Sequence, residues 1–255
     1  MKISTRFLAT LCTLAALSFC LFAQGPSPKS QKEVEALMAV QNAQNNQQRI
    51  EAAQKLIQDF ADTEFKSWAL FNIMQSYELM GDIPNTIVYA EQVLSAKPSN
   101  FEAASAHVRI ANGIARQTKE FDLDRDEKLQ KVADNANKAI AMLATATKVN
   151  DQIPDEQWTL ITQNEAAIAY DAMAQGEFVR KKYQEAAEFF VKAIQAQPDP
   201  VRMLKAGNSY RLAKKFSDAM NMLNNAINDP NTNDQIKSLA EREKKLVEEA
   251  QNAGA

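Results

Sequence analysis

Residues 182–200, KYQEAAEFFVKAIQAQPDP, and residues 215–230, KFSDAMNMLNNAINDP, share one pattern, displaced by 33 positions. In each stretch an aromatic residue is followed by alanine three positions later, a bulky residue four positions after that, then Ala-Ile, and finally a proline. The matched pairs are Tyr183 and Phe216, Ala186 and Ala219, Phe190 and Leu223, Ala193 and Ala226, and Ile194 and Ile227. This spacing places the apolar side chains on one face of a helix. The sequence therefore predicts a repeated amphipathic α-helix.

A second helix precedes the second copy. Within residues 200–233 an earlier apolar stripe is followed by the basic turn Lys214-Lys215. The stripe consists of Met203, Ala206, Gly207 and Tyr210. Two helices of about 14 residues cannot bury both of their apolar faces alone, so stacking of successive pairs is expected. With only six glycines and eight prolines in 255 residues, the composition also favours helix throughout.

Residues 67–100, SWALFNIMQSYELMGDIPNTIVYAEQVLSAKPSN, contain a whole unit and resemble a tetratricopeptide repeat. The matching positions are Asn72, Ile73, Tyr77, Gly81, Asp82, Ile83, Thr86, Val93, Leu94 and Pro98. Two positions depart from the family pattern: Leu70 stands where a tryptophan is usual, and Met74 where a small residue is usual. The resemblance implies an all-α fold, a tetratricopeptide-type α-solenoid of antiparallel helix pairs.

The same resemblance divides nearly the whole chain. The clearest repeats are residues 67–100, about 160–199 and 200–233, and degenerate pairs cover 30–65 and 101–147. A C-terminal helix over about 233–250 is expected to solvate the last repeat. Residues 24–29 form a short polar linker, and residues 251–255 a tail.

Several helix starts carry the spacing of a capping box. The pairs are Ser30 with Glu33, Ser99 with Glu102, Asp124 with Glu127, and Thr232 with Gln235. Asp199 before Pro200 predicts an N-cap followed by proline in the first turn.

The first 23 residues have the layout of a secretory signal peptide. Lys2 and Arg6 precede an apolar run over residues 7–22, and Ala23 offers a small residue for cleavage. An uncleaved membrane anchor is the alternative, and lipoprotein anchoring at Cys20 is a further one, although Phe19 departs from the small residue which that signal requires. We expect an exported protein, periplasmic or secreted.

Cleavage after Ala23 would remove both cysteines, Cys12 and Cys20, and with them disulfides, thiol catalysis and cysteine metal sites. It would leave 27 basic against 32 acidic residues, a formal charge of −5. Because phosphate neutralisation dominates nucleic-acid binding, this charge argues against a nucleic-acid partner.

No catalytic motif is evident, and we expect neither an enzyme nor a cofactor or metal site. The one histidine, His107, lies on a predicted helix among apolar residues without a partner cluster. The stretch FDLDRDEKL, residues 121–129, begins like a calcium loop, but Glu127 replaces the turning glycine and Ala133 the closing glutamate. A capped helix start explains it more simply.

Two basic turns, residues 180–182 and 214–215, are expected along one edge of a stacked solenoid. A solvated turn is the simplest interpretation of each. An edge for anionic lipid or an acidic partner is the alternative.

In the tetratricopeptide family, first-helix residues line a concave binding groove. The resemblance places Trp68, Phe71, Gln75 and Glu78 there in one unit, and Val201, Leu204, Asn208 and Arg211 in another. Apolar anchors mixed with amides and charges suit an extended or helical peptide. Packing of Trp68 and Phe71 against the preceding helix pair is the alternative. The family's chaperone-tail clamp has lysine and asparagine where Phe71 and Gln75 stand, which argues against that mode of carboxylate capture.

The function expected from this resemblance is a non-catalytic scaffold or adaptor that binds another protein or peptide in the bacterial cell envelope. The unit boundary DFADTEFKSWALFNI, residues 59–73, resembles the repeat junctions of cell-envelope assembly proteins. The alternatives are a solenoid that binds a small molecule or glycan, and a self-assembling structural protein. The partner's identity and the oligomeric state stay open.

Overall fold

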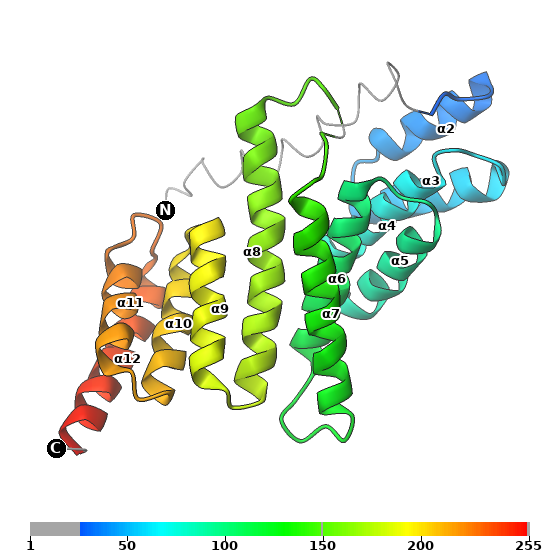
Figure 1. Ribbon diagram of the computed structural model, residues 1–255. Coiled ribbons are helices and arrows are strands. Elements are labelled where there is room, and N and C mark those ends of the chain that lie inside the picture. The colour runs from blue at the N-terminus through cyan, green and yellow to red at the C-terminus, as the bar shows by residue number, and fades with distance from the viewer. Residues whose placement is uncertain (1–25, 149, 254–255) are drawn as a thin grey trace. The chain divides into compact units, whose positions relative to one another are not determined.

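The computed structural model describes residues 26–148 and 150–253, and all of the regular structure in these ranges is α-helical (Figure 1). The helices are α2 (Gln31–Gln41), α3 (Asn46–Asp59), α4 (Lys66–Met80), α5 (Ile83–Ser95), α6 (Asn100–Gln117), α7 (Arg125–Leu143), α8 (Asp155–Val179), α9 (Tyr183–Ala196), α10 (Pro200–Leu212), α11 (Phe216–Asn228) and α12 (Asp234–Ala253). They pack as sequential antiparallel pairs, so the predicted all-α, tetratricopeptide-like fold class is confirmed.

The predicted signal peptide, with its cleavage and lipidation sites, lies outside the described residues. Within residues 26–148 and 150–253, no helix combines the length and the apolar character needed to span a lipid bilayer.

The chain forms two compact units. Unit 1 contains the described residues up to Arg109 together with residues 144–159, and unit 2 contains residues 110–143 and those from Leu160 onward. Helices α6 and α8 therefore each contribute to both units.

In unit 1, α2, α3, α4 and α5 contact one another in chain order around a shared apolar core. The core members are Leu37, Val40, Ile50, Ala53, Leu56, Phe65, Ala69 and Ile73. Gly81 ends α4 in the left-handed conformation, with φ of 74°, which glycine adopts without steric cost. Asp82 then caps α5 by accepting a hydrogen bond from the Asn85 amide at 3.1 Å. The tight turn lets α4 and α5 pack face to face.

In unit 2, α9 to α12 contact one another in order, and α12 also reaches back to α10. Alanine and glycine stand where these helices approach most closely. A Cβ atom on Gly207 would lie 2.6 Å from Leu223 Cγ, so α10 and α11 pack at this distance only because residue 207 has no side chain. Through these contacts α12 takes the place that the first helix of a further pair would occupy.

The α8–α9 and α10–α11 turns repeat the left-handed residue seen at Gly81, but they use lysine. Lys181 has φ of 62° and Lys214 has φ of 59°. A left-handed lysine costs about 1 kcal/mol relative to an unstrained residue. The α4–α5, α8–α9 and α10–α11 turns thus share one left-handed residue, which is glycine in the first turn and lysine in the other two.

The helix caps agree with the sequence in part. Ser99 and Glu102 form a reciprocal capping box, with the Glu102 amide donating to Ser99 Oγ at 3.2 Å and the Ser99 amide donating to Glu102 Oε2 at 2.8 Å. The cap predicted at Thr232 is wrong, because Asn233 Oδ1 accepts from the Ile236 amide at 2.9 Å. The Thr232 hydroxyl instead donates to the Ala226 carbonyl.

Candidate functional site

Unit 2 contains a pocket of about 270 Å³. Helices α8, α9, α10 and α12 form it, so it exists only once the last two helix pairs and the terminal helix have packed. Its lining residues are Gln175, Phe178, Phe190, Leu204, Lys205, Asn208, Ser209, Leu239 and Glu243.

The apolar part of the pocket comes from four helices. Phe190 of α9 is buried and belongs to a core cluster with Ala174 and Ala206. Phe178, in the last turn of α8, packs its ring edge against Tyr183 with centroids 5.3 Å apart. Leu239 of α12 is 42% exposed, which is high for a leucine beside a core. A ligand that covered Leu239 would therefore remove apolar surface from water.

The polar side of the pocket is organised by Glu243. One of its carboxylate oxygens accepts hydrogen bonds from Asn208 Nδ2 and from Arg211 Nε, each at 2.9 Å. Arg211 and Glu243 are both about four-fifths buried. Charge-assisted hydrogen bonds of this kind are stronger than neutral ones, so they hold α12 against α10 and orient the Asn208 amide.

Lys205 brings a positive charge to the same pocket. Its ammonium lies 5.8 Å from the centroid of the Phe190 ring, within the range of a cation–π interaction. The residue is exposed, and no described carboxylate lies within ion-pair distance of it. The pocket thus combines apolar side chains with the Lys205 cation and the side-chain amides of Gln175 and Asn208.

A buried ion pair positions α8 against α10. Arg202 Nε donates to Asp171 Oδ2 at 2.8 Å, and Arg202 Nη1 donates to the Gln197 carbonyl at 3.0 Å. Burial raises the pKa of the Asp171 carboxyl, although the charge of Arg202 opposes this. Asp171 Oδ1 is buried without a hydrogen-bond partner in the structure, so this carboxylate is only partly satisfied.

The structure brings together two of the four residues predicted on α10. Leu204 and Asn208 line the pocket. Arg211 lies next to it through Glu243, whereas Val201 is exposed in the first turn of α10. Their role in binding stays a prediction.

The four residues predicted on α4 lie in unit 1 and are largely engaged within that unit. Trp68 packs against the core shared by α2, α3 and α4. The Phe71 ring lies 6.4 Å from that of Phe101. Glu78 accepts a hydrogen bond from Arg109 Nε at 2.9 Å, and Gln75 is half-buried. The two predicted sets therefore belong to different units.

Sequence reasoning missed Phe178, Phe190, Leu239 and Glu243 as pocket residues. A signal for Glu243 exists in the spacing of opposite charges. Three ion pairs each join the first helix of one helix pair to the first helix of the next, counting α12 as a first helix. The pairs are Glu78 with Arg109, Asp171 with Arg202, and Arg211 with Glu243, and their partners are 31, 31 and 32 residues apart in sequence. A separation close to one repeat places two residues at matching heights on neighbouring first helices.

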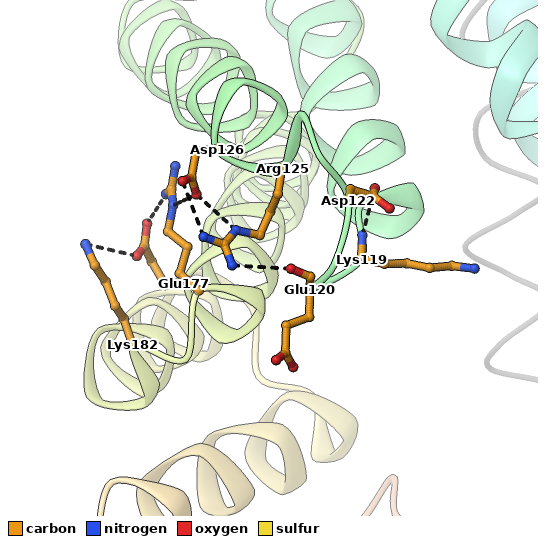
Figure 2. Close-up of polar contacts among 8 residues, drawn as sticks. Lys119, Glu120, Asp122, Arg125, Asp126, Glu177 and Lys182 are labelled. Atoms are coloured by element: carbon orange, nitrogen blue, oxygen red, sulfur yellow. Dashed lines mark hydrogen bonds and ion pairs between the residues drawn. The ribbon is translucent and has the colours of Figure 1, made fainter.

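The acidic loop between α6 and α7, residues 118–124, pairs with its own basic neighbours. Lys128 forms ion pairs with Asp122 at 3.2 Å and Asp124 at 2.8 Å. The Lys119 amide donates to Asp122 Oδ2 at 3.1 Å, and these bonds lower the pKa of Asp122 (Figure 2). Among the described residues no cluster of potential metal ligands is found.

The basic turn at residues 180–182 is neutralised in the structure rather than free. Arg180 pairs with Glu177 at 2.6 Å, Lys181 with Glu120 at 2.6 Å, and Lys182 with Glu177 at 3.6 Å. Figure 2 shows the Lys182 ammonium directed toward the Glu177 carboxylate. An anion-binding edge at this turn is therefore not supported.

His107 is buried on α6 in unit 1, beside Val108, which is fully buried. Its position agrees with packing inside a helical core.

No family model matches the chain. No curated protein sequence matches it either. Among solved structures, the chain is similar to one described as the TPR2AB-domain:pHSP90-complex of yeast Sti1, with 14% sequence identity over 94% of this chain and 99% of that one, and a TM-score of 0.29. This likeness is too small to bear on ligand or function.

Proposed function

We propose that the chain is a non-catalytic scaffold that binds a peptide segment of another protein through the pocket on α8, α9, α10 and α12. The observation that carries the proposal is the pocket's composition. Phe178, Leu204 and Leu239 can enclose one apolar side chain, while Lys205 and Asn208 can contact the peptide on either side of it.

The size of the pocket favours a peptide side chain over a small molecule or glycan. Sites for drug-sized ligands usually enclose about 300–1,000 Å³. At about 270 Å³ this pocket lies at the small end of that range. It is large enough for a phenylalanine, leucine or methionine side chain, because a cavity of about 150 Å³ already holds benzene.

The chemistry of the rim favours acidic residues next to the anchor. Lys205 is the exposed cation at the pocket, and Arg211 is already paired with Glu243. A carboxylate beside the anchoring side chain would meet Lys205, and a backbone carbonyl could accept a hydrogen bond from an amide such as Asn208. Full burial of one large apolar side chain contributes about 1.5–3 kcal/mol, so a single pocket predicts weak binding that further contacts would strengthen.

We also propose that this binding takes place outside the cytoplasm, in the bacterial cell envelope. Support comes from the basic and apolar pattern of residues 1–23.

The experiment is a binding series with short labelled peptides that differ only in one central residue, followed by fluorescence anisotropy. Peptides centred on Phe, Leu or Met with flanking Asp should bind, and those centred on Ser or Lys should not. Leu239→Lys should abolish binding without unfolding, because Leu239 is already half-exposed. Val88→Lys, on exposed α5 surface in unit 1, is the matched control. Equal binding by the Leu239→Lys variant would contradict the proposal.

A further inference from the structure

The α6–α7 loop carries the two most exposed large apolar side chains in the described part of the chain. Phe121 is 88% exposed and Leu123 is fully exposed. Both lie within residues 118–124, between the end of α6 and the start of α7. Only Asp122 separates these two exposed side chains, so the loop tip presents apolar surface that a contact would remove from water.

Polar contacts hold this loop on both sides of its apolar tip. Arg125 Nη1 donates to the Glu120 carbonyl at 3.3 Å, and the Lys119 amide bonds to Asp122 (Figure 2). Glu120 also pairs with Lys181 of the α8–α9 turn at 2.6 Å. The backbone around Phe121 is thereby braced against two helix ends of unit 2. A preorganised loop loses less conformational entropy when it binds.

The charges around the loop do not favour an anionic membrane. The loop and α7 start, residues 119–128, together with Glu177 and the turn 180–182, contain six basic and six acidic side chains. The three cations of the turn are each paired with a carboxylate. Headgroup attraction requires an excess of lysine and arginine, which this surface lacks.

The pocket of unit 2 matches this loop in size and charge. A phenyl ring fits in about 150 Å³, and the pocket offers about 270 Å³. Asp122 and Asp124 flank Leu123, and Lys128 forms ion pairs with both of them. Lys205 at the pocket has no described carboxylate within ion-pair distance. The segment Phe121-Asp122-Leu123-Asp124 is therefore an apolar anchor with flanking carboxylates.

We infer that Phe121 of one copy enters the unit 2 pocket of a second copy, with the flanking carboxylates meeting Lys205. This inference rests on the proposed function, because it names one ligand for the same pocket. The contact joins two different surfaces of the molecule, so it is heterologous, and repetition of it forms rings or open chains. Phe121 does not fill the pocket of its own chain in the structure, because its side chain is exposed.

The test is the mass of the purified protein measured by sedimentation equilibrium over a range of concentrations. The average mass should rise with concentration. The double variant Phe121→Ser/Leu123→Ser and the pocket variant Leu239→Lys should each weaken association at least tenfold. Val88→Ser, an exposed apolar residue on α5, should associate like the unchanged protein. Circular dichroism of each variant checks that the helices are retained.

A mixing experiment separates a head-to-tail contact from other modes. The loop variant keeps a working pocket, and the pocket variant keeps a working loop. An equimolar mixture should therefore form a one-to-one complex and nothing larger. A constant monomer mass for the unchanged protein, association that survives both substitutions, or a mixture that stays monomeric would each overturn the inference.

A peptide measurement keeps this inference distinct from the proposed function. The probe is a labelled peptide of residues 117–126, QTKEFDLDRD. If other apolar-centred peptides bind the pocket but this peptide does not and the protein stays monomeric, the scaffold proposal stands and self-association is wrong. If no peptide binds, the pocket has no such role and both fail.

Discussion

Arg202 Nε lies 2.8 Å from Asp171 Oδ2, and this pair joins two first helices, α8 and α10, that are separated by a complete second helix. Glu78 and Arg109 form the equivalent contact in unit 1, also 31 residues apart. Such a pair links two neighbouring repeats directly, through the first helix of each. Its partial burial makes it sensitive to the loss of either partner.

Arg202→Met should destabilise the protein by about 2–4 kcal/mol, because it leaves the Asp171 carboxylate largely buried without its cation. Urea unfolding at neutral pH measures this. The double variant Arg202→Met/Asp171→Leu should regain much of the loss, since it removes both charges. No recovery in the double variant would show that packing rather than charge accounts for the effect.

Stability should fall with rising pH through the titration of Asp171. Burial raises the pKa of this carboxyl above its unfolded value, so the native state binds the proton more tightly. The contribution is fully present below the unfolded pKa of about 3.9 and is lost as pH rises through the folded pKa. Asp171→Asn should therefore show a smaller decrease in unfolding free energy than the unchanged protein across this acid range. Identical pH profiles for the two proteins would contradict the assignment.

Two glycines in helices should respond in opposite ways to alanine. A Cβ on Gly207 would meet Leu223 Cγ at 2.6 Å and the Ala219 carbonyl oxygen at 3.3 Å, whereas a Cβ on Gly176 would find its nearest neighbour at 3.5 Å. Gly207→Ala should cost about 1–3 kcal/mol through overpacking. Gly176→Ala should gain about 0.5–1 kcal/mol from helix propensity. Thermal unfolding of both variants provides the comparison, and equal shifts would count against this packing argument.

Lys214→Gly should stabilise the protein by up to about 1 kcal/mol, because Lys214 has a left-handed backbone with φ of 59°. Lys215→Gly is the matched control: Lys215 has φ of −92°, so glycine relieves no strain there and should lower stability slightly. Chemical denaturation of the two variants distinguishes them. Stabilisation by both substitutions would point to charge rather than backbone geometry.

Glu243→Ala should weaken the attachment of α12 and change the charge of the pocket. It removes the acceptor shared by Asn208 and Arg211, which costs about 1–3 kcal/mol because Arg211 is left largely buried. Arg211 also becomes available, so peptides with flanking Asp should bind more tightly at low ionic strength. Anisotropy with acidic and neutral peptides measures the gain. An equal gain in affinity for the acidic and the neutral peptides would indicate that the shape of the pocket changed, and not its charge.

Repeat units and helix positions were accessible from sequence because they depend on local periodicity. The alanine, phenylalanine and leucine stripes at residues 183–194 and 216–227 lie at the interfaces that the pattern predicted. The family resemblance placed Leu204 and Asn208 in a groove, and both line the pocket in the structure. Glu243 could not be placed in this way, because its role depends on how α12 docks against α10.

The sequence by itself determined an all-helical chain of repeated pairs, because a side chain's direction on a helix follows from spacing of 3.6 residues per turn. Only the tertiary structure decided which charges meet. The sequence predicted a solvated basic turn at residues 180–182 and a capped helix start at residues 121–129, and the structure joins the two regions through Lys181 with Glu120 and Arg180 with Asp126. Ion pairing acts over a few ångströms of space, and the approach of two loops is set by helix lengths and packing rather than by either loop's own residues.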